Sequence, residues 1–237
     1  DTSIMFPVFF NKVTYTELVL YPIYSPCKFS VDLHIYNQNG DKLTTLTNVL
    51  ENITSESSHC SIHLYDELKD RLNNLEEVKA ALAIYKFESK VPTRLKTALN
   101  VGMRNVENGI PCNICFTANP GNPNILGKDG IFRWAPLLNV GRSVFVAQNG
   151  SPLKEYTQTA NIKMRIVNEE SNNELIREVS IKPYGTYTLD VAEDEEVTKF
   201  LGGNTGWITI QADSPFVTAW YFDFCEQSGI VGGDHSF

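Results

Sequence analysis

Residues 29–37 read FSVDLHIYN, and residues 160–168 read ANIKMRIVN. In both stretches the apolar residues occupy every second position, the last residue is Asn, and a polar turn follows. A period of two with one polar face is typical of a strand in an antiparallel sheet that is covered on one side. The match therefore predicts that the chain contains the same β module twice.

The correspondence continues downstream. Residues 61–64 match residues 188–191, and residues 83–85 match residues 209–211. The offset between the copies is 131 at the first pair (166 − 35), 127 at the second (189 − 62) and 126 at the third (210 − 84). Loops of different length in a duplicated unit produce such a gradual change. The alternative is chance alternation in a β-rich sequence.

The wider pattern predicts an all-β fold of two tandem antiparallel β-sandwich modules with short helical turns. Alternation and β-branched or aromatic residues predict strands at residues 14–20, 31–36, 42–47, 60–65, 78–87, 92–100, 142–147, 160–168, 175–181, 186–191, 206–212 and 215–224. Asn39-Gly40 predicts a tight hairpin. Short helices are expected at 66–72, capped by Asp66, and at 193–201, closed by Gly202-Gly203.

We expect the first module at residues 1–105, and a connector, the second module and a docked C-terminal tail at residues 106–237. The connector contains a Pro- and Gly-rich loop, and its apolar flanks, residues 110–116 and 132–138, are expected to pair with each other. The segment Ile230–Phe237 is more apolar than an ordinary frayed chain end. Burying the apolar side chain of Phe237 is favourable, so we expect the tail to pack against the second module.

Composition and charge exclude some classes of partner. The net charge of −8, from 28 acidic and 20 basic residues, disfavours a nucleic-acid partner, because phosphate binding requires a basic surface. No apolar run approaches the ~18 residues of a membrane helix, so we expect no membrane insertion. Five cysteines cannot all pair, and their low number favours a reducing, cytoplasmic compartment. The start lacks both a signal-peptide pattern and an initiator Met, which predicts that a leader or tag preceded Asp1.

Cys112-Asn-Ile-Cys115 is a C-x-x-C motif, the kind that redox and zinc sites use. Here it lies in an alternating segment, and residues i and i+3 of a strand point to opposite faces about 10 Å apart. A disulfide requires Cα atoms within about 7 Å, and no second cysteine or histidine pair completes a zinc set. We therefore expect both thiols to be free, and we predict no cofactor and no metal.

Two pairs of polar residues are candidates for contact on exposed sheet surfaces, and for the histidines a metal or acid–base role is the less favoured alternative. If the strands that carry His34 and His63 are neighbours, both imidazoles point outward and can meet. Their counterparts in the second copy are Arg165 and Asp190, which predicts a cross-strand ion pair.

The three tryptophans raise the question of a sugar-stacking platform. Trp207 and Trp220 lie inside strand patterns, so we expect them in the core. Trp134 is the one expected to be exposed, and it is the candidate for contact with a sugar.

The C-terminal segment is the other candidate site. Asp234 and His235, beside Asp223 and Glu226, are side chains that can bind a cation. The favoured interpretation is a purely structural tail that turns back at Gly232-Gly233. No catalytic residue is predicted, since the sequence lacks G-x-S-x-G, P-loop, G-x-G-x-x-G and H-E-x-x-H motifs.

Each half resembles the small bacterial β-sandwich modules of the sensory-rhodopsin-transducer type, present here twice in tandem. The shared pattern is an alternating strand that ends in Asn, a polar hairpin, a second alternating strand, and a late strand near Val91-Pro92 or Ser214-Pro215. The extended tail and the connector depart from that pattern. The resemblance implies a non-catalytic, oligomer-forming binding role.

These observations predict a non-enzymatic structural or protein-interaction protein, with a protein partner or self-association as a homo-oligomer. The alternative is a carbohydrate- or metal-binding module that uses loops at one end of a sandwich. A hydrolase ranks third.

Overall fold

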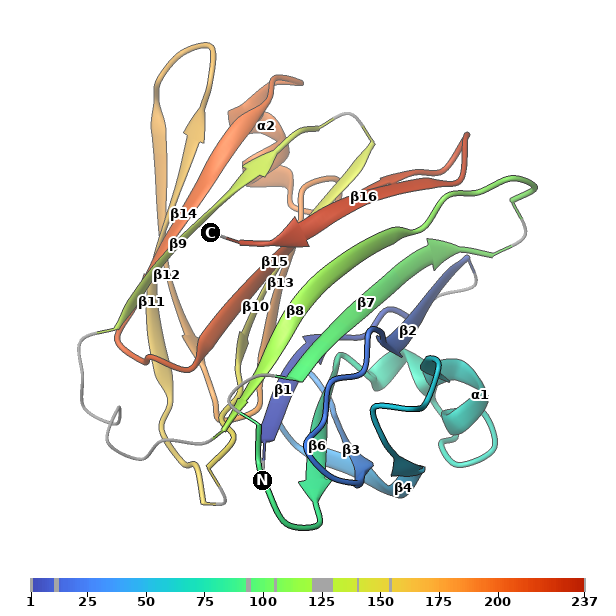
Figure 1. Cartoon of the computed structure of the whole chain (residues 1–237). Helices are drawn as coiled ribbons and strands as arrows, with labels where there is room; N and C mark the ends of the chain where they lie inside the picture. The colour runs from blue at the N-terminus through green and yellow to red at the C-terminus, as the bar shows by residue number, and fades with distance from the viewer. Residues whose placement is uncertain are drawn as a thin grey trace.

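The computed structural model describes residues 2–10, 13–92, 95–104, 106–120, 130–139, 141–153 and 155–236. It confirms the predicted all-β class, because antiparallel strands form nearly all of its regular structure. Figure 1 shows the strands as two groups, residues 131–236 on one side and the N-terminal half on the other. Within the described ranges, no helix is long and apolar enough to cross a membrane.

The first module comprises β1 (Thr2–Pro7), β2 (Thr14–Leu20), β3 (Phe29–Tyr36), β4 (Lys42–Ile53), β5 (Cys60–His63), α1 (Leu64–Leu68), a 3-10 turn (Leu75–Glu77), β6 (Ala80–Phe87), β7 (Leu95–Met103) and β8 (Cys112–Pro120). The strands are hydrogen-bonded in the order β4-β3-β6-β1-β8-β7-β2-β5. The described contact between β1 and β8 is short, with Thr2 opposite Pro120 and Ser3 opposite Asn119. We call the two halves on either side of this seam sheet A (β4-β3-β6-β1) and sheet B (β8-β7-β2-β5).

The second module comprises β9 (Ile131–Leu137), β10 (Arg142–Asn149), β11 (Ala160–Asn168), β12 (Glu174–Ile181), β13 (Thr186–Asp190), α2 (Glu195–Leu201), β14 (Gly206–Ala212), β15 (Val217–Cys225) and β16 (Ile230–His235). Its strands form two sheets, which we call sheet C (β13-β10-β15-β16) and sheet D (β12-β11-β14-β9).

The two modules have the same topology. Sheet A corresponds strand by strand to sheet D, and sheet B to sheet C, when β1 is matched with β9, β2 with β10, and so on to β8 with β16. The α-helix follows the fifth strand in each module. The two stretches with matching sequence are β3 and β11, which occupy equivalent places. The predicted pair of tandem sandwiches is therefore confirmed.

The structure moves the boundary between the modules. β8 completes the first module by pairing with β7 and β1, and β9 completes the second by pairing with β14. The repeats therefore end and begin near Pro120 and Ile131, whereas a boundary after residue 105 separates β7 from its partner β8. The predicted pairing of segments 110–116 and 132–138 is wrong for the same reason. Residues 121–129 of the connector lie outside the described part of the chain.

One part of the repeat alignment was wrong by a single residue. Ile35 lies opposite Ala81, and Ile166 lies opposite Ile208, so equivalent residues of β6 and β14 differ by 127 (208 − 81) rather than 126. A one-residue slip moves side chains to the other face of a strand. Ile84 accordingly faces away from the core that its proposed counterpart Ile210 occupies.

The second helix, α2, lies within its predicted range, whereas α1 spans Leu64–Leu68 and overlaps the predicted range 66–72 only in part. Asp194 is the N-cap of α2, where its carboxylate accepts a hydrogen bond of 3.0 Å from Val197 N. Gly202 ends α2 in the left-handed conformation at φ 59°, as predicted. In contrast, the N-cap of α1 is His63, whose side chain makes no capping hydrogen bond. Asp66 therefore lies inside the helix, where it pairs with Lys69 instead of capping.

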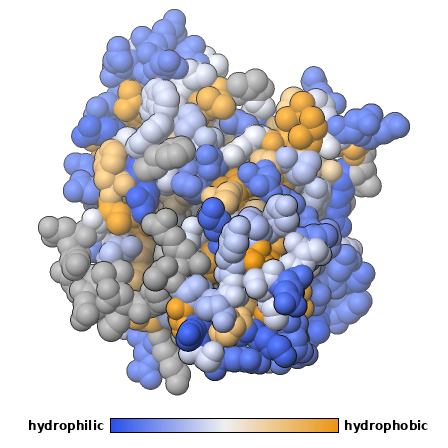
Figure 2. All heavy atoms as spheres, viewed as in Figure 1, coloured by the Kyte–Doolittle hydropathy of each residue, from blue (hydrophilic) through white to orange (hydrophobic). Residues whose placement is uncertain are grey.

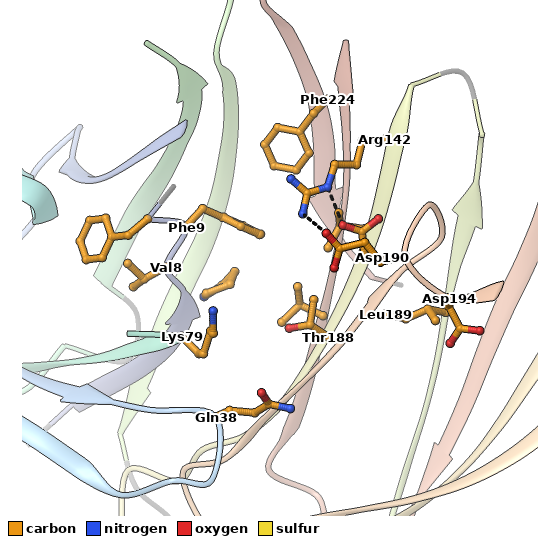
Figure 3. Close-up of a pocket in the computed structure, with 15 residues that line it drawn as sticks. Val8, Phe9, Gln38, Lys79, Arg142, Thr188, Leu189, Asp190, Asp194 and Phe224 are labelled. Atoms are coloured by element: carbon orange, nitrogen blue, oxygen red, sulfur yellow. Dashed lines mark hydrogen bonds and ion pairs between the residues drawn. The ribbon is translucent and has the colours of Figure 1, made fainter. Parts of the chain in front are cut away.

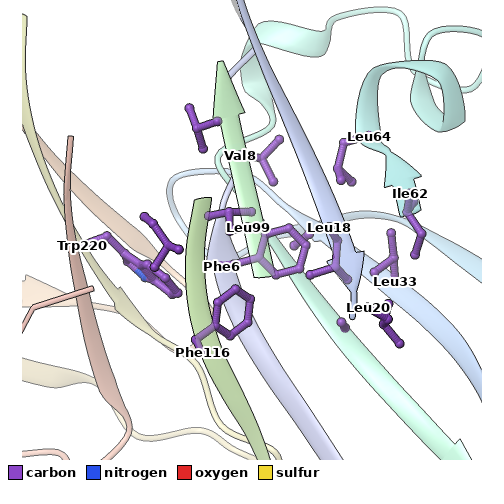
Figure 4. Packing of buried hydrophobic residues seen from close by; sticks show 14 of the residues in the cluster. Phe6, Val8, Leu18, Leu20, Leu33, Ile62, Leu64, Leu99, Phe116 and Trp220 are labelled. Atoms are coloured by element: carbon purple, nitrogen blue, oxygen red, sulfur yellow. The ribbon is translucent and has the colours of Figure 1, made fainter. Parts of the chain in front are cut away.

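One apolar core extends across both modules (Figure 4). It joins residues of sheets A and B, such as Leu33 and Leu99, to residues on the outer face of sheet C. The Phe116 ring packs edge-on against Trp220 at 5.2 Å, which confirms that Trp220 is a core residue. A second core lies between sheets C and D and includes Phe145. Sheet C is therefore buried on both faces.

Candidate functional site

The C-terminal tail is an edge strand. β16 pairs with β15, and Val231 is buried, which agrees with the predicted docking over residues 230–236. Phe237 lies outside the described residues.

The four C-terminal candidate residues do not form one site, although His235 Nε2 lies 3.9 Å from Asp234 Oδ1. Asp234 lies opposite Tyr221 on the face that also carries Asp223, whereas His235 lies opposite Trp220 on the other face. Burial raises the pKa of Asp223, and the Ser143 hydroxyl donates a hydrogen bond to its carboxylate. Glu226 is exposed in the turn after β15. Nowhere in the described part of the chain do three or more His, Cys, Asp or Glu side chains gather as a metal site would require.

The C-x-x-C motif lies in strand β8, as predicted. Cys112 is buried and Cys115 is exposed, so the two thiols lie on opposite faces. Burial raises the pKa of Cys112 to about 11, which makes it a poor nucleophile at neutral pH.

The predicted Arg165–Asp190 pair is wrong, and the condition for a His34–His63 contact, neighbouring strands, is not met. His34 belongs to sheet A and His63 to sheet B, where His63 lies 3.2 Å from Glu17. Arg165 in sheet D pairs with Glu174, while Asp190 in sheet C pairs with Arg142 at 2.5 Å. Strand alternation predicts a side chain's face but does not identify the neighbouring strand.

Exposed aromatic side chains gather on the outer face of sheet D. Trp134 in β9 and Trp207 in β14 have ring centroids 5.5 Å apart and are 38% and 41% exposed. Phe132, two residues before Trp134 and therefore on the same face of β9, is 59% exposed. We call these three residues the aromatic face. Trp134 is exposed as predicted, whereas Trp207 is not a core residue, because its neighbours Gly206 and Ile208 take the inner face.

A polar groove adjoins the aromatic face. One row of side chains crosses all four strands of sheet D, since Phe132 lies opposite Gln211, Gln211 opposite Lys163, and Lys163 opposite Glu178. The last three line an open groove of about 680 Å³. At its far end Asp213 accepts hydrogen bonds from Asn161. The aromatic rings are thus continuous with amide, ammonium and carboxylate groups.

The equivalent face of sheet A in the first module is covered by residues of the second module. By strand register, Met5 and Ala80 occupy the places of Trp134 and Trp207. Both are buried, in a small cluster against which Tyr184 of the second module packs. Tyr184 also stacks on Tyr36 at 4.9 Å. Sheet D therefore exposes large rings where sheet A has small or buried side chains.

A cavity of about 430 Å³ lies between the two modules (Figure 3). Its walls on one side come from the segment after β1 and the start of β6, and on the other from β10, β13 and the end of β15. Arg142 and Asp190 form an ion pair at its edge. No sequence pattern pointed to this cavity, because its two sides come from different modules.

The molecular surface shows no single large apolar region in the view of Figure 2, where hydrophobic residues form separate patches among hydrophilic ones. Isolated exposed apolar residues are normal on a folded protein. The grouping of aromatic residues on sheet D is therefore the more informative feature.

Comparisons with known proteins find low similarities. No protein-family model matches the chain, and no curated protein matches it. Among solved structures, the pilus backbone of Streptococcus pneumoniae is similar at 13% identity over 98% of this chain and 78% of that one, with a TM-score of 0.18. A glycosyl hydrolase family 2 member from Bacteroides cellulosilyticus DSM 14838 is similar at 10% identity and a TM-score of 0.19, over 98% of this chain and 27% of that one. Likenesses this low say nothing about what the chain does.

Proposed function

We propose that the protein is a non-enzymatic binding protein, that its contact surface is the aromatic face with the adjoining groove, and that its ligand is a carbohydrate. The observation that carries the proposal is the row from Phe132 through Gln211 and Lys163 to Glu178, beside the exposed Trp134. Aromatic rings next to several hydrogen-bonding groups are what a sugar requires.

The chemistry of a pyranose matches this surface. Its C–H face is apolar and stacks on an aromatic ring, while its hydroxyl groups both donate and accept hydrogen bonds. Trp134 and Phe132 would take the C–H face, with ring positions about 6.8 Å apart along the strand. Gln211 offers a donor and an acceptor, Lys163 offers donors, and Glu178 offers acceptors. An open groove suits a chain of sugars that extends beyond the site.

A protein partner is the second candidate for the same face. The supporting observation is that protein covers the equivalent face of the first module, through Tyr184. Ile176, which is 50% exposed on the outer face of sheet D, adds an apolar group that a sugar does not need.

A glycan array, followed by calorimetric titration of any positive glycan, tests the proposal. Trp134→Ala should weaken binding roughly tenfold, or about 1.4 kcal/mol, because it removes the stacking surface. Tyr24→Ala is the matched control, since Tyr24 is an aromatic residue of the first module with 69% exposure. This variant should bind as the parent protein does.

Two outcomes would contradict carbohydrate binding. One is an array without any bound glycan, and the other is equal loss of affinity in the Trp134 and Tyr24 variants. If sedimentation instead shows self-association that Trp134→Ala abolishes, the aromatic face belongs to a contact with a second copy of the chain.

A further inference from the structure

The cavity between the modules has the size and lining of a small-molecule site. Its volume of about 430 Å³ lies within the range of 300–1,000 Å³ that ligand pockets occupy. Such pockets are often found between domains, with apolar walls and a few polar groups that orient the ligand. The cavity is separate from the aromatic face, since sheet C forms its floor and sheet D lies on the other side of that sheet.

The middle of the cavity is apolar. Val144 and Val146 lie on the outer face of β10, and Phe224 lies beside them on β15. Val8 and Phe9 face them from the first module, and Phe9 packs edge-on against Phe224 with the ring centroids 5.5 Å apart. A ligand with a flat or aliphatic body can therefore contact apolar atoms from both modules.

Hydrogen-bond donors lie at one end of the cavity. Figure 3 shows the ammonium group of Lys79 and the amide of Gln38 on one side of the cavity, with Thr188 of β13 across from them. These groups offer N–H and O–H donors. No carboxylate among the described residues lies within ion-pair distance of Lys79. A buried or half-buried cation without an anion is an electrostatic cost that an anionic ligand removes.

The acidic residues around the cavity are already engaged or exposed. Arg142 neutralises Asp190, and Arg177 holds Asp194 through two hydrogen bonds. Glu193 is 77% exposed at its side chain and lies 3.8 Å from Arg142. Lys79 is therefore the cation that remains for a ligand.

We propose that this cavity binds a small amphipathic carboxylate, with its carboxylate at Lys79, Gln38 and Thr188 and its apolar body between Phe9 and the two valines of β10. No sequence motif points to this site. It is held together by both modules and exists only in the intact tandem.

Fluorine NMR titration of the full chain with 4-fluorophenylacetate tests the proposal, beside the neutral 4-fluorophenylacetamide and the cationic 4-fluorophenethylamine. The acid should bind at least fivefold more tightly than the amide, and the amine should bind weakest. Lys79→Met should weaken binding of the acid about tenfold and leave binding of the amide unchanged. Lys199→Met, which alters an exposed lysine of α2 outside the cavity, is the matched control and should change neither.

A second variant locates the site. Val146→Phe should fill the apolar middle and abolish binding of all three probes, with its melting curve recorded to confirm folding. Absence of binding by every probe at millimolar concentration would overturn the proposal. Equal affinity for acid and amide, unchanged binding by Lys79→Met, or full binding by a folded Val146→Phe variant would do the same. Trp134→Ala should leave these titrations unchanged, so the result is independent of carbohydrate binding.

Discussion

Single side chains that bond to the backbone end the strands and begin the second helix. Asn37 Oδ1 accepts hydrogen bonds of 2.9 Å from the backbone of both Asn39 and Asp41. Asn168 Oδ1 does the same for Glu170 at 3.0 Å and Ser171 at 3.2 Å. The Asn that ends both matching stretches is thus a turn-forming residue. These features are local, which is why the sequence revealed them.

Asp194 combines a helix cap with an ion pair, so its loss should be measurable. Asp194→Ala removes the bond to Val197 N and leaves Arg177 without this partner, which should lower the free energy of unfolding by about 1–2 kcal/mol at pH 7. Urea unfolding measures this difference. Glu195→Ala, in the same first turn but without the cap bond, is the control and should cost less.

The effect should depend on pH with a definite sign. Arg177 holds the pKa of Asp194 below its ordinary value of 3.8. A carboxylate with a depressed folded-state pKa stabilises the protein fully above its unfolded pKa and loses this contribution as the pH falls through the folded value. The gap between parent and Asp194→Ala should therefore shrink below about pH 3.8, and a gap that widens on acidification would contradict the role of Arg177.

At the scale of elements, alternating patterns located most strands. They did not identify which strands are neighbours, and for the strand that carries Trp207 they did not identify the face that points to the core. Trp207 lies in a predicted strand, yet whether it or Ile208 faces inward depends on the register with β11 and β9. The same limit explains why Arg165 and Asp190 were assigned to one surface although they lie in different sheets. Of the candidate site on sheet D, the sequence revealed Trp134 alone, since the row from Phe132 to Glu178 depends on three strand pairings.

The edge strand β16 should contribute to stability. Deleting residues 230–237 removes the ladder with β15 and the burial of Val231, a side chain worth about 1.5–3 kcal/mol. The melting temperature should fall by at least about 3 °C, as calorimetry would measure. Deleting residues 236–237 alone keeps the paired residues 230–235, removes the hydrogen bond from Ser236 N to Ala219 O, and is the control. A melting curve unchanged by the longer deletion would show that β16 contributes no stability.

At the scale of the whole molecule, the duplication was predictable from the sequence, but the apolar core that joins the two modules was not. The apolar residues of β10 and β15 predict strands, and nothing local tells that Val146 and Trp220 meet the first module while Phe145 and Ala219 meet sheet D. The cavity between the modules escaped prediction for the same reason. Its polar residues are far apart in sequence and share no motif.

A core that extends across both modules should make unfolding cooperative. Trp220→Ala should cost about 3–5 kcal/mol, since a fully buried tryptophan is replaced by a cavity. In calorimetry the parent chain should unfold in one transition whose calorimetric and van't Hoff enthalpies agree. Two separated transitions in the parent chain would show that the modules unfold independently.

Sheets B and C carry different side chains at equivalent places on their outer faces. Val144 lies between Asp190 and Phe222 on the face of sheet C that the first module covers. The equivalent residue of sheet B is Glu17, which lies between His63 and Asn100. If both places carried apolar residues, sheet B would expose an apolar face that another copy of the chain can cover. Head-to-tail contacts of that kind continue into fibres unless they close into a ring. The polar residues of sheet B lack this apolar contact surface, so they oppose head-to-tail association between copies of the chain.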